Sequence, residues 1–259
     1  MAITRQDHMM TMAYQSLRCL LLAAAGCGVA HGAEVVMAFS DSLPPYVMSK
    51  TDSGIELEVV SEALAYRHHV LVPRYLPMPR LALAFRAHQV DGIMYDGGDD
   101  LRAADTFYGS PAVVYNNVFI TLKSRHLHIR KPSDLQGLSV IAFPGAARQY
   151  PHWLGDGGGT RAHTERNDPS SQPALLDLGR YDVVLCDARV YRHYLKEEQR
   201  RNPAFRPQPV QQHDFTEPDP RDYRPVFHDA AIRDDFDAGL RFLKRSGRYQ
   251  AIYDKYMKG

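Results

Sequence analysis

Short runs of apolar residues alternate along the chain with longer segments in which apolar residues recur every three or four positions. The short runs predict buried strands, and the longer segments predict amphipathic helices. In the first part of the chain the predicted strands are 34–39, 69–76 and 90–95, and the predicted helices are 54–69 and 79–88. The order is therefore β-α-β-α-β, which is typical of α/β proteins.

A β-rich run at 110–123 interrupts this order. It is longer than the usual ~5–6 residues of a strand, so we expect it to cross between two lobes. A second α/β series follows, and two helices end the chain. Its expected elements are a strand at 138–143, a turn at Gly145, a helix from Ala146, a helix near 172–179, a strand at 181–186, and helices at 188–199, 234–247 and 248–257.

The pattern predicts two lobes, each a β-sheet flanked by helices. One lobe takes 34–113 and 213–259, because the polar, proline-rich stretch at 202–222 returns the chain to it, and the other takes 114–212. A cleft between such lobes is lined by the carboxyl ends of strands and the amino ends of helices. We expect a small polar molecule to bind there.

The start of the chain has the pattern of a secretory signal peptide, predicted over 1–33. An apolar run begins after Arg18 and is too short to cross a hydrocarbon core of about 30 Å. Small residues follow it and suit cleavage after Gly32 or Ala33. Lipid attachment at Cys27 is an open alternative. We therefore expect a secreted, periplasmic protein, with or without a lipid anchor.

Composition narrows the chemistry further. Of the 259 residues 44% are hydrophobic and 24% charged, and the formal net charge is +1, so the chain is typical of a soluble globular protein and has no basic footprint for nucleic acid. After signal cleavage Cys186 would be the single cysteine, and its apolar surroundings indicate a buried strand thiol. The histidines lack metal-ligand spacing, so we expect no metal site. We also expect no other cofactor and a monomeric protein.

Seven local motifs occur in an order that resembles the family 3 extracellular solute-binding proteins, which have the type 2 periplasmic binding fold. They are LPPYV, GIELEVVSEAL, VDGIMY with an arginine after it, YGSP, KPSDLQGLSVIAFPG, LGRYDVVLCD and FLKRSGRYQAIYDKYM. The resemblance spans 34–259. It implies a protein that captures an amino acid or related carboxylate and delivers it to an ABC permease.

The resemblance assigns roles to four positions. Arg102 matches the arginine that clamps the ligand carboxylate, for which a planar guanidinium fork is suited. Asp187 matches the acid that takes the ligand ammonium, although Asp is also a frequent N-cap at a strand–helix junction. In the first loop, Asp41 matches a polar contact and Tyr46 an aromatic wall, with packing in the lobe core as the alternative for Tyr46.

Three departures from the family pattern bear on the ligand. Asp96, after Tyr95, stands where amino-acid binders carry a hydroxyl residue, and its carboxylate would repel a ligand carboxylate or neutralise the arginine. The second-lobe turn has lost its hydroxyl at Ala146 and gained Arg148, while its backbone amides remain suited to an anion. The arginine is also one residue closer to Asp91 than is common.

Two other functions stay open. Some members of this fold are periplasmic dehydratases of cyclohexadienyl acids, and Asp96 or Asp187 in a closed cleft could protonate a leaving hydroxyl. The same lobes also serve as sensor modules, here in trans, because the chain has no signalling domain. No residue of the sequence requires catalysis, so the leading hypothesis is a binding protein and not an enzyme.

Overall fold

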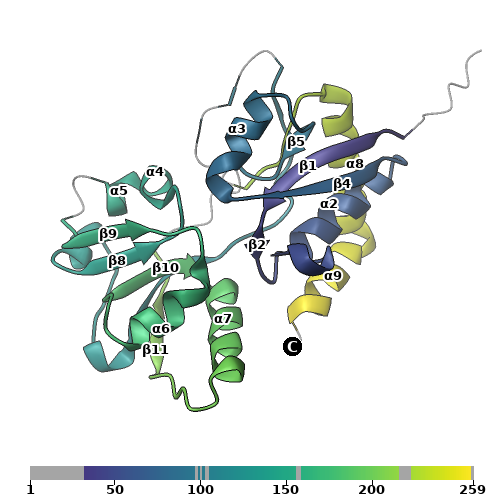
Figure 1. Cartoon of the computed structure of the whole chain (residues 1–259). Helices are drawn as coiled ribbons and strands as arrows, with labels where there is room; N and C mark the ends of the chain where they lie inside the picture. The colour runs from purple at the N-terminus through teal and green to yellow at the C-terminus, as the bar shows by residue number, and fades with distance from the viewer. Residues whose placement is uncertain are drawn as a thin grey trace, which may run out of the picture. The chain divides into compact units, whose positions relative to one another are not determined.

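Two five-stranded sheets organise the part of the chain that the computed structural model describes, residues 32–96, 99, 101–102, 105–155, 159–215 and 223–257 (Figure 1). Cys27 and residues 1–31 of the predicted signal peptide lie outside the described residues. Residues Ala33–Gly259 form one compact unit that contains both sheets. Among the described residues, no helix is long and apolar enough to cross a membrane.

The first sheet has the strand order β4-β1-β5-β12-β6. Its parallel part joins β1 to β4 and β5, whereas β12 runs antiparallel to both of its neighbours. The strands are β1 (Glu34–Ser40), β4 (Val70–Leu76), β5 (Gly92–Ile93), β6 (Phe107–Tyr108) and β12 (Val226–Phe227). A separate two-stranded ribbon of β2 (Ser42–Leu43) and β3 (Val47–Met48) follows β1. Sequence patterns predicted β1, β4 and β5.

Strand β1 is buried on both faces because helices cover both sides of the sheet. Its odd-numbered residues, such as Val35 and Met37, belong to a core shared with α2 (Ile55–Ala65) and α8 (Ala230–Ser246). Ala38 points the other way and packs with α3 (Leu81–Arg86). Successive side chains of a strand point to opposite faces, so a continuous apolar run fits a sheet covered on both sides.

The second sheet has the order β11-β7-β10-β8-β9. Strand β10 pairs parallel with β8 and antiparallel with β7, and β8 pairs parallel with β9. The strands are β7 (Asn117–Leu122), β8 (Ser139–Ala142), β9 (Ala162–Glu165), β10 (Val183–Asp187) and β11 (Val210–His213). On one face lie α6 (Gln172–Asp177) and α7 (Ala188–Arg201), and on the other α4 (Ala146–Gln149) and α5 (Pro151–Leu154) (Figure 1).

The C-terminal helices α8 and α9 (Arg248–Met257) return to the first sheet, as predicted. Helices α8 and α2 lie side by side (Figure 1). Gly239 of α8 sits against the backbone of α2, where a Cβ atom would lie 1.9 Å from the carbonyl oxygen of Ala63. This close approach explains a glycine in the interior of a helix.

The predicted long strand at 110–123 is wrong in its first half, because β7 begins at Asn117. The earlier backbone bonds to side chains instead of to a neighbouring strand. The amide of Ser110 donates to Asp237 at 2.7 Å, and the amide of Val114 donates to Tyr253 at 3.1 Å. These bonds satisfy the backbone donors and leave the segment irregular.

Candidate functional site

A cavity opens where β1, β8 and β10 end. Its lining comes from both sheets and comprises Ser40, Asp41, Ser42, Leu43, Met78, Tyr95, Tyr115, Asn117, Phe143, Pro144, Arg166, Asn167, Pro169, Gln172, Cys186, Asp187, Val190 and Tyr223. The carboxyl ends of strands are where ligands of open α/β sheets bind. Three of the predicted site residues, Asp41, Tyr95 and Asp187, line it.

Two buried polar side chains of this lining have no hydrogen-bond partner among the described residues. The Ser40 hydroxyl belongs to a residue that is 8% exposed, and both amide atoms of Gln172 belong to one that is 1% exposed. A buried polar group without a partner costs roughly 1–3 kcal/mol, so such groups are rare in folded proteins. A polar ligand in the cavity would satisfy them.

A row of tyrosine rings forms the apolar part of the wall. Tyr115 stacks obliquely on Tyr223 with 4.3 Å between ring centroids, and Tyr223 stacks on Tyr95 at 5.5 Å. The amide group of Asn117 donates to the Tyr223 hydroxyl at 2.7 Å, and that of Gln149 donates to it at 3.1 Å. These bonds tie Tyr223, in the turn before β12, to β7 and α4 and hold its ring in place.

A second cavity shares Ser40 and the tyrosines with the first and contains Glu56. Glu56 lies in the first turn of α2 but is buried, and it accepts a hydrogen bond from the Tyr115 hydroxyl. Burial raises the pKa of Glu56 to about 7, although the bond from Tyr115 works in the opposite direction. A carboxyl group in this place carries a proton or a negative charge according to pH.

Asp187 is the N-cap of α7, which confirms that reading of its position. One carboxylate oxygen accepts the amides of Arg189 at 2.8 Å and Val190 at 3.0 Å. The other accepts the amide of Asn116 at 2.6 Å and the hydroxyl of Tyr46 at 3.2 Å. Burial raises the pKa of Asp187 despite these bonds. The carboxylate is thus largely saturated by the chain itself.

Tyr46 is fully buried and does not line the cavity. Its hydroxyl accepts a bond from the Arg189 guanidinium at 3.1 Å, and its ring packs on Tyr115 with centroids 4.2 Å apart. It therefore packs the core between Asp187 and Tyr115, the alternative that the sequence left open.

Three further predicted site residues lie outside the cavity lining. Arg102 is exposed. Asp96 accepts a bond from the Tyr108 hydroxyl at 2.9 Å. Arg148, from α4, is exposed and pairs with Asp99 at 3.1 Å. The structure does not bring the Arg102 guanidinium to the cavity, and Arg166 is the arginine of the described chain that lines it.

The predicted anion site at the second-lobe turn is occupied by the chain's own carboxylate. The amides of Gly145 and Ala147 donate to the two oxygens of Glu165 at 2.7 and 2.9 Å. Ala146 is buried, and its amide faces the carbonyl of Phe143 at 3.2 Å. A ligand carboxylate would have to displace Glu165 to use these amides.

Sequence reasoning missed Ser40, Glu56, Gln172 and the tyrosines Tyr115 and Tyr223. One signal was available, because Ser40 directly precedes Asp41 at the end of a predicted strand. Gln172 and Glu56 look like ordinary polar residues at helix starts. Only the packing of other segments over them makes them buried.

Cys186 is a buried thiol whose pKa is raised by burial and by the adjacent Asp187. It stays protonated at physiological pH, which confirms the interpretation as a strand thiol and excludes an activated nucleophile at this position.

No protein-family model matches the chain. An arginine-binding periplasmic protein of Mannheimia haemolytica is 21% identical over 246 residues, which cover 93% of this chain and 98% of the relative. An ancestral arginine-binding protein bound to arginine superposes with a TM-score of 0.67 at 16% identity, covering 88% of this chain and 99% of that one.

An amino acid ABC transporter substrate-binding protein of Streptococcus pneumoniae bound to L-arginine gives a TM-score of 0.65 at 16% identity, covering 88% and 95% of the two chains. These relatives are named for binding and not for catalysis. The likeness extends over nearly the whole length of each protein, and the sheet order and helix placement agree with the expected architecture. The chain has the two-lobed α/β fold of the periplasmic amino-acid-binding proteins.

Proposed function

We propose that the chain is a periplasmic solute-binding protein that captures an amino acid with a positively charged side chain for an ABC importer. The observation that carries this proposal is the cavity at the strand ends, where Ser40 and Gln172 are buried without partners among the described residues. A buried polar group without a partner carries a desolvation penalty, and a polar ligand that reaches these side chains would relieve it.

The lining favours a cation for the ligand side chain. Asp41 and Asp187 contribute carboxylates, and the tyrosine rings offer π faces on which a guanidinium or ammonium group can rest. Glu56 adds a further acidic group at the deeper cavity. We assign the ligand ammonium to Asp41, because the oxygens of Asp187 already accept four bonds from the chain.

The ligand carboxylate needs a different partner from the one that the resemblance implies. Both arginines are exposed, but Arg166 lines the cavity, whereas Arg102 lies outside the lining. We therefore assign the carboxylate to Arg166, together with the Gln172 amide group. Both residues belong to the second lobe that we propose for 114–212, and Asp41 belongs to the first, so one ligand would contact both lobes.

Contacts to both lobes suit a protein that works by closing around its ligand, because a ligand shifts a conformational equilibrium only through contacts that differ between the two states. We propose that the closed, monomeric form docks on a membrane permease. The ABC transporter relative supports this partner. Capture itself would be the same if the partner were a membrane sensor.

A thermal-shift screen tests the proposed function. The mature protein is heated with L-arginine, L-lysine, L-histidine, L-glutamine, L-glutamate, putrescine or prephenate. A ligand at a hundred times its Kd stabilises the folded state by about 2.7 kcal/mol. For a domain of this size that shift corresponds to a rise in Tm of about 5–10 °C. We expect the largest shift with a cationic amino acid.

Two variants make the screen specific. Asp41→Asn should abolish most of the shift, whereas Asp234→Asn, which changes an exposed carboxylate on α8, should leave it intact. A shift with L-glutamate alone would contradict the cationic ligand. Conversion of prephenate to a product would replace binding with the dehydratase alternative, and no shift with any amino acid would overturn the proposal.

A further inference from the structure

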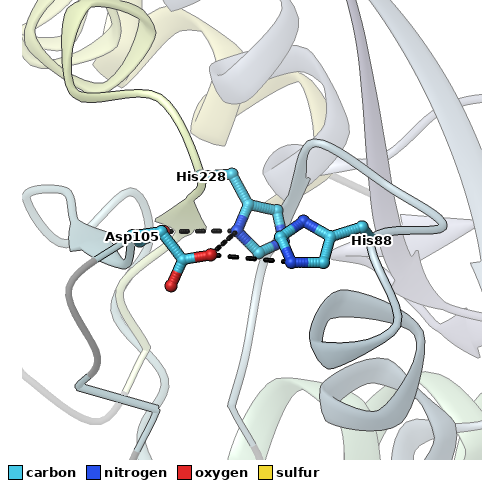
Figure 2. Close-up of side chains that lie close together, drawn as sticks. All are labelled: His88, Asp105 and His228. Carbon is cyan, nitrogen blue, oxygen red and sulfur yellow. Dashed lines mark hydrogen bonds and ion pairs between the residues drawn. The ribbon is translucent and has the colours of Figure 1, made fainter.

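Three residues far apart in the sequence meet in the first lobe, away from the cavity lining. They are His88, which follows α3, Asp105, which precedes β6, and His228, which follows β12 (Figure 2). One ligand atom from each lies within 4.8 Å of the other two. Sequence spacing alone gave no indication of this cluster, because 140 residues separate the two histidines.

The ring of His228 is held in a fixed orientation. It lies parallel to the ring of Phe85 with centroids 3.8 Å apart, and His88 stacks on its other side at 4.1 Å. Its Nε2 atom lies 3.0 Å from the carbonyl oxygen of Phe85. A carbonyl can only accept, so Nε2 donates a proton to it, and in the neutral form of the ring Nδ1 then carries the lone pair.

That lone pair faces oxygen atoms. Nδ1 of His228 lies 3.2 Å from the backbone carbonyl of Asp105 and 3.6 Å from its carboxylate. Dashed lines in Figure 2 mark the contacts of Asp105 with the two histidines. Nε2 of His88 lies 3.5 Å from the same carboxylate oxygen. Acceptors that face one another repel, so a positive charge among them stabilises the arrangement. The charge can be a proton on the imidazole or a metal cation bound by all three groups.

The spacing fits a metal cation. Around a tetrahedral zinc ion with ligands at about 2.0–2.1 Å, neighbouring ligand atoms lie about 3.3–3.4 Å apart. The two nitrogen–oxygen distances of 3.5 and 3.6 Å are close to that value. The side chains of His88 and Asp105 are more than half exposed, at 65% and 56%. The His88 ring can therefore turn out of its stack on His228, which is needed before both imidazoles can direct an in-plane lone pair at the same ion.

We propose that His88, Asp105 and His228 form a surface site for a divalent transition-metal ion such as zinc. Two imidazoles and one carboxylate are ligands that zinc prefers, and the open side of the cluster leaves a fourth position for water. The hydrogen bond from His228 to the Phe85 carbonyl is the kind of outer contact that fixes the tautomer of a metal-binding histidine.

The metal would link three separate segments of the first lobe. His228 directly follows β12, and its backbone amide donates a hydrogen bond to the backbone carbonyl of Asp91 at 3.0 Å. Binding of an ion to the folded state alone stabilises that state by mass action. The site stands apart from ligand capture, because none of its residues lines the cavity.

Zinc titration of untagged protein tests the site. Calorimetry at about pH 7.5 should show one saturable zinc site, and thermal melts should show a higher Tm with zinc but not with magnesium. His88→Ala and Asp105→Asn should each weaken zinc binding by about tenfold or more. His152→Ala, which removes an exposed histidine outside the cluster, should leave the affinity unchanged.

A lower pH supplies a second readout, because protons compete with the metal for imidazole nitrogen. Zinc affinity should therefore fall between about pH 7.5 and pH 5.5. Two results would overturn the proposal. One is the absence of saturable zinc binding in the wild-type protein, which would leave the cluster as an imidazolium–carboxylate pair. The other is a zinc affinity in His88→Ala and Asp105→Asn that equals that of His152→Ala and the wild type.

Discussion

At the scale of single residues, the site depends on polar groups that the fold leaves without partners. Replacement of Gln172 by leucine removes two buried, unpartnered amide atoms and keeps a side chain of similar size. We expect Gln172→Leu to raise the Tm of the unliganded protein, because the desolvation penalty of the amide disappears. We also expect it to weaken ligand binding.

Gln172→Leu should therefore raise the Tm of the unliganded protein and lower its ligand affinity. A purely structural glutamine would give a variant that is less stable, or one that is equally stable with unchanged ligand affinity. Thermal melts with and without ligand measure both quantities in the same experiment. Gln199→Leu, the same exchange at an exposed position on α7, is a control that should change neither quantity appreciably.

Glu56 gives the stability of the protein a pH dependence. Its folded pKa is about 7 and its ordinary value is 4.5, so the folded state binds the proton more tightly than the unfolded state. The contribution to stability is therefore complete below about pH 4.5 and is lost as the pH rises through about 7. Integrated over that range, the loss is about 3 kcal/mol.

Glu56→Gln should flatten this part of the pH profile. The amide oxygen of glutamine can still accept the hydrogen bond of Tyr115, so the main change is the loss of titration. Urea unfolding of both proteins across the range measures the difference. Glu62→Gln removes the partner of Arg248 from an exposed pair and should leave the slope as in the wild type. Equal slopes for the Glu56 variant and the wild type would refute the assignment.

At the scale of elements, the packing of α2 against α8 sets the position of the C-terminal helices. Gly239→Ala would normally favour a helix by about 1 kcal/mol. Here the new Cβ atom would meet the Ala63 carbonyl at 1.9 Å, so the helices must move apart. We expect a net destabilisation of about 1–3 kcal/mol in urea unfolding. A stabilised variant would contradict this packing.

Sequence patterns located the long helices but not the shortest strands. The helices α2, α7, α8 and α9 have several turns of apolar periodicity, and the patterns located all four. The two-residue strands β6 and β12 were missed because so short a segment has no period. Strand β7 was predicted too long because the apolar residues before it pack against side chains without pairing to a neighbouring strand.

The site residues that lie at the ends of predicted strands could be predicted from the sequence. Asp41 and Asp187 lie where a strand ends, and both line the cavity. The resemblance that assigned these two residues also assigned Arg102 and Ala146. Arg102 lies outside the lining, and the amides beside Ala146 hold Glu165. Loop conformation and tertiary burial decide these positions, and neither can be deduced from the local sequence.

At the scale of the whole molecule, the order of weak motifs was enough to predict the fold, which solved structures only 16% identical share. Those motifs record how strands, turns and helices alternate, and this order survives extensive substitution because it fixes the sheet topology. The ligand depends on a few side chains in the cavity, which such motifs do not determine.

The central claim is that the cavity at the ends of β1, β8 and β10 binds a cationic amino acid through Asp41 and Gln172. Calorimetric titration of L-arginine into the wild-type protein and the Gln172→Leu variant tests it most directly. We expect saturable binding of one arginine per wild-type chain. We expect the affinity of the variant to be lower by about tenfold or more, because a charge-assisted hydrogen bond to the ligand is lost. Absence of binding to the wild type, or equal affinity in both proteins, would contradict it.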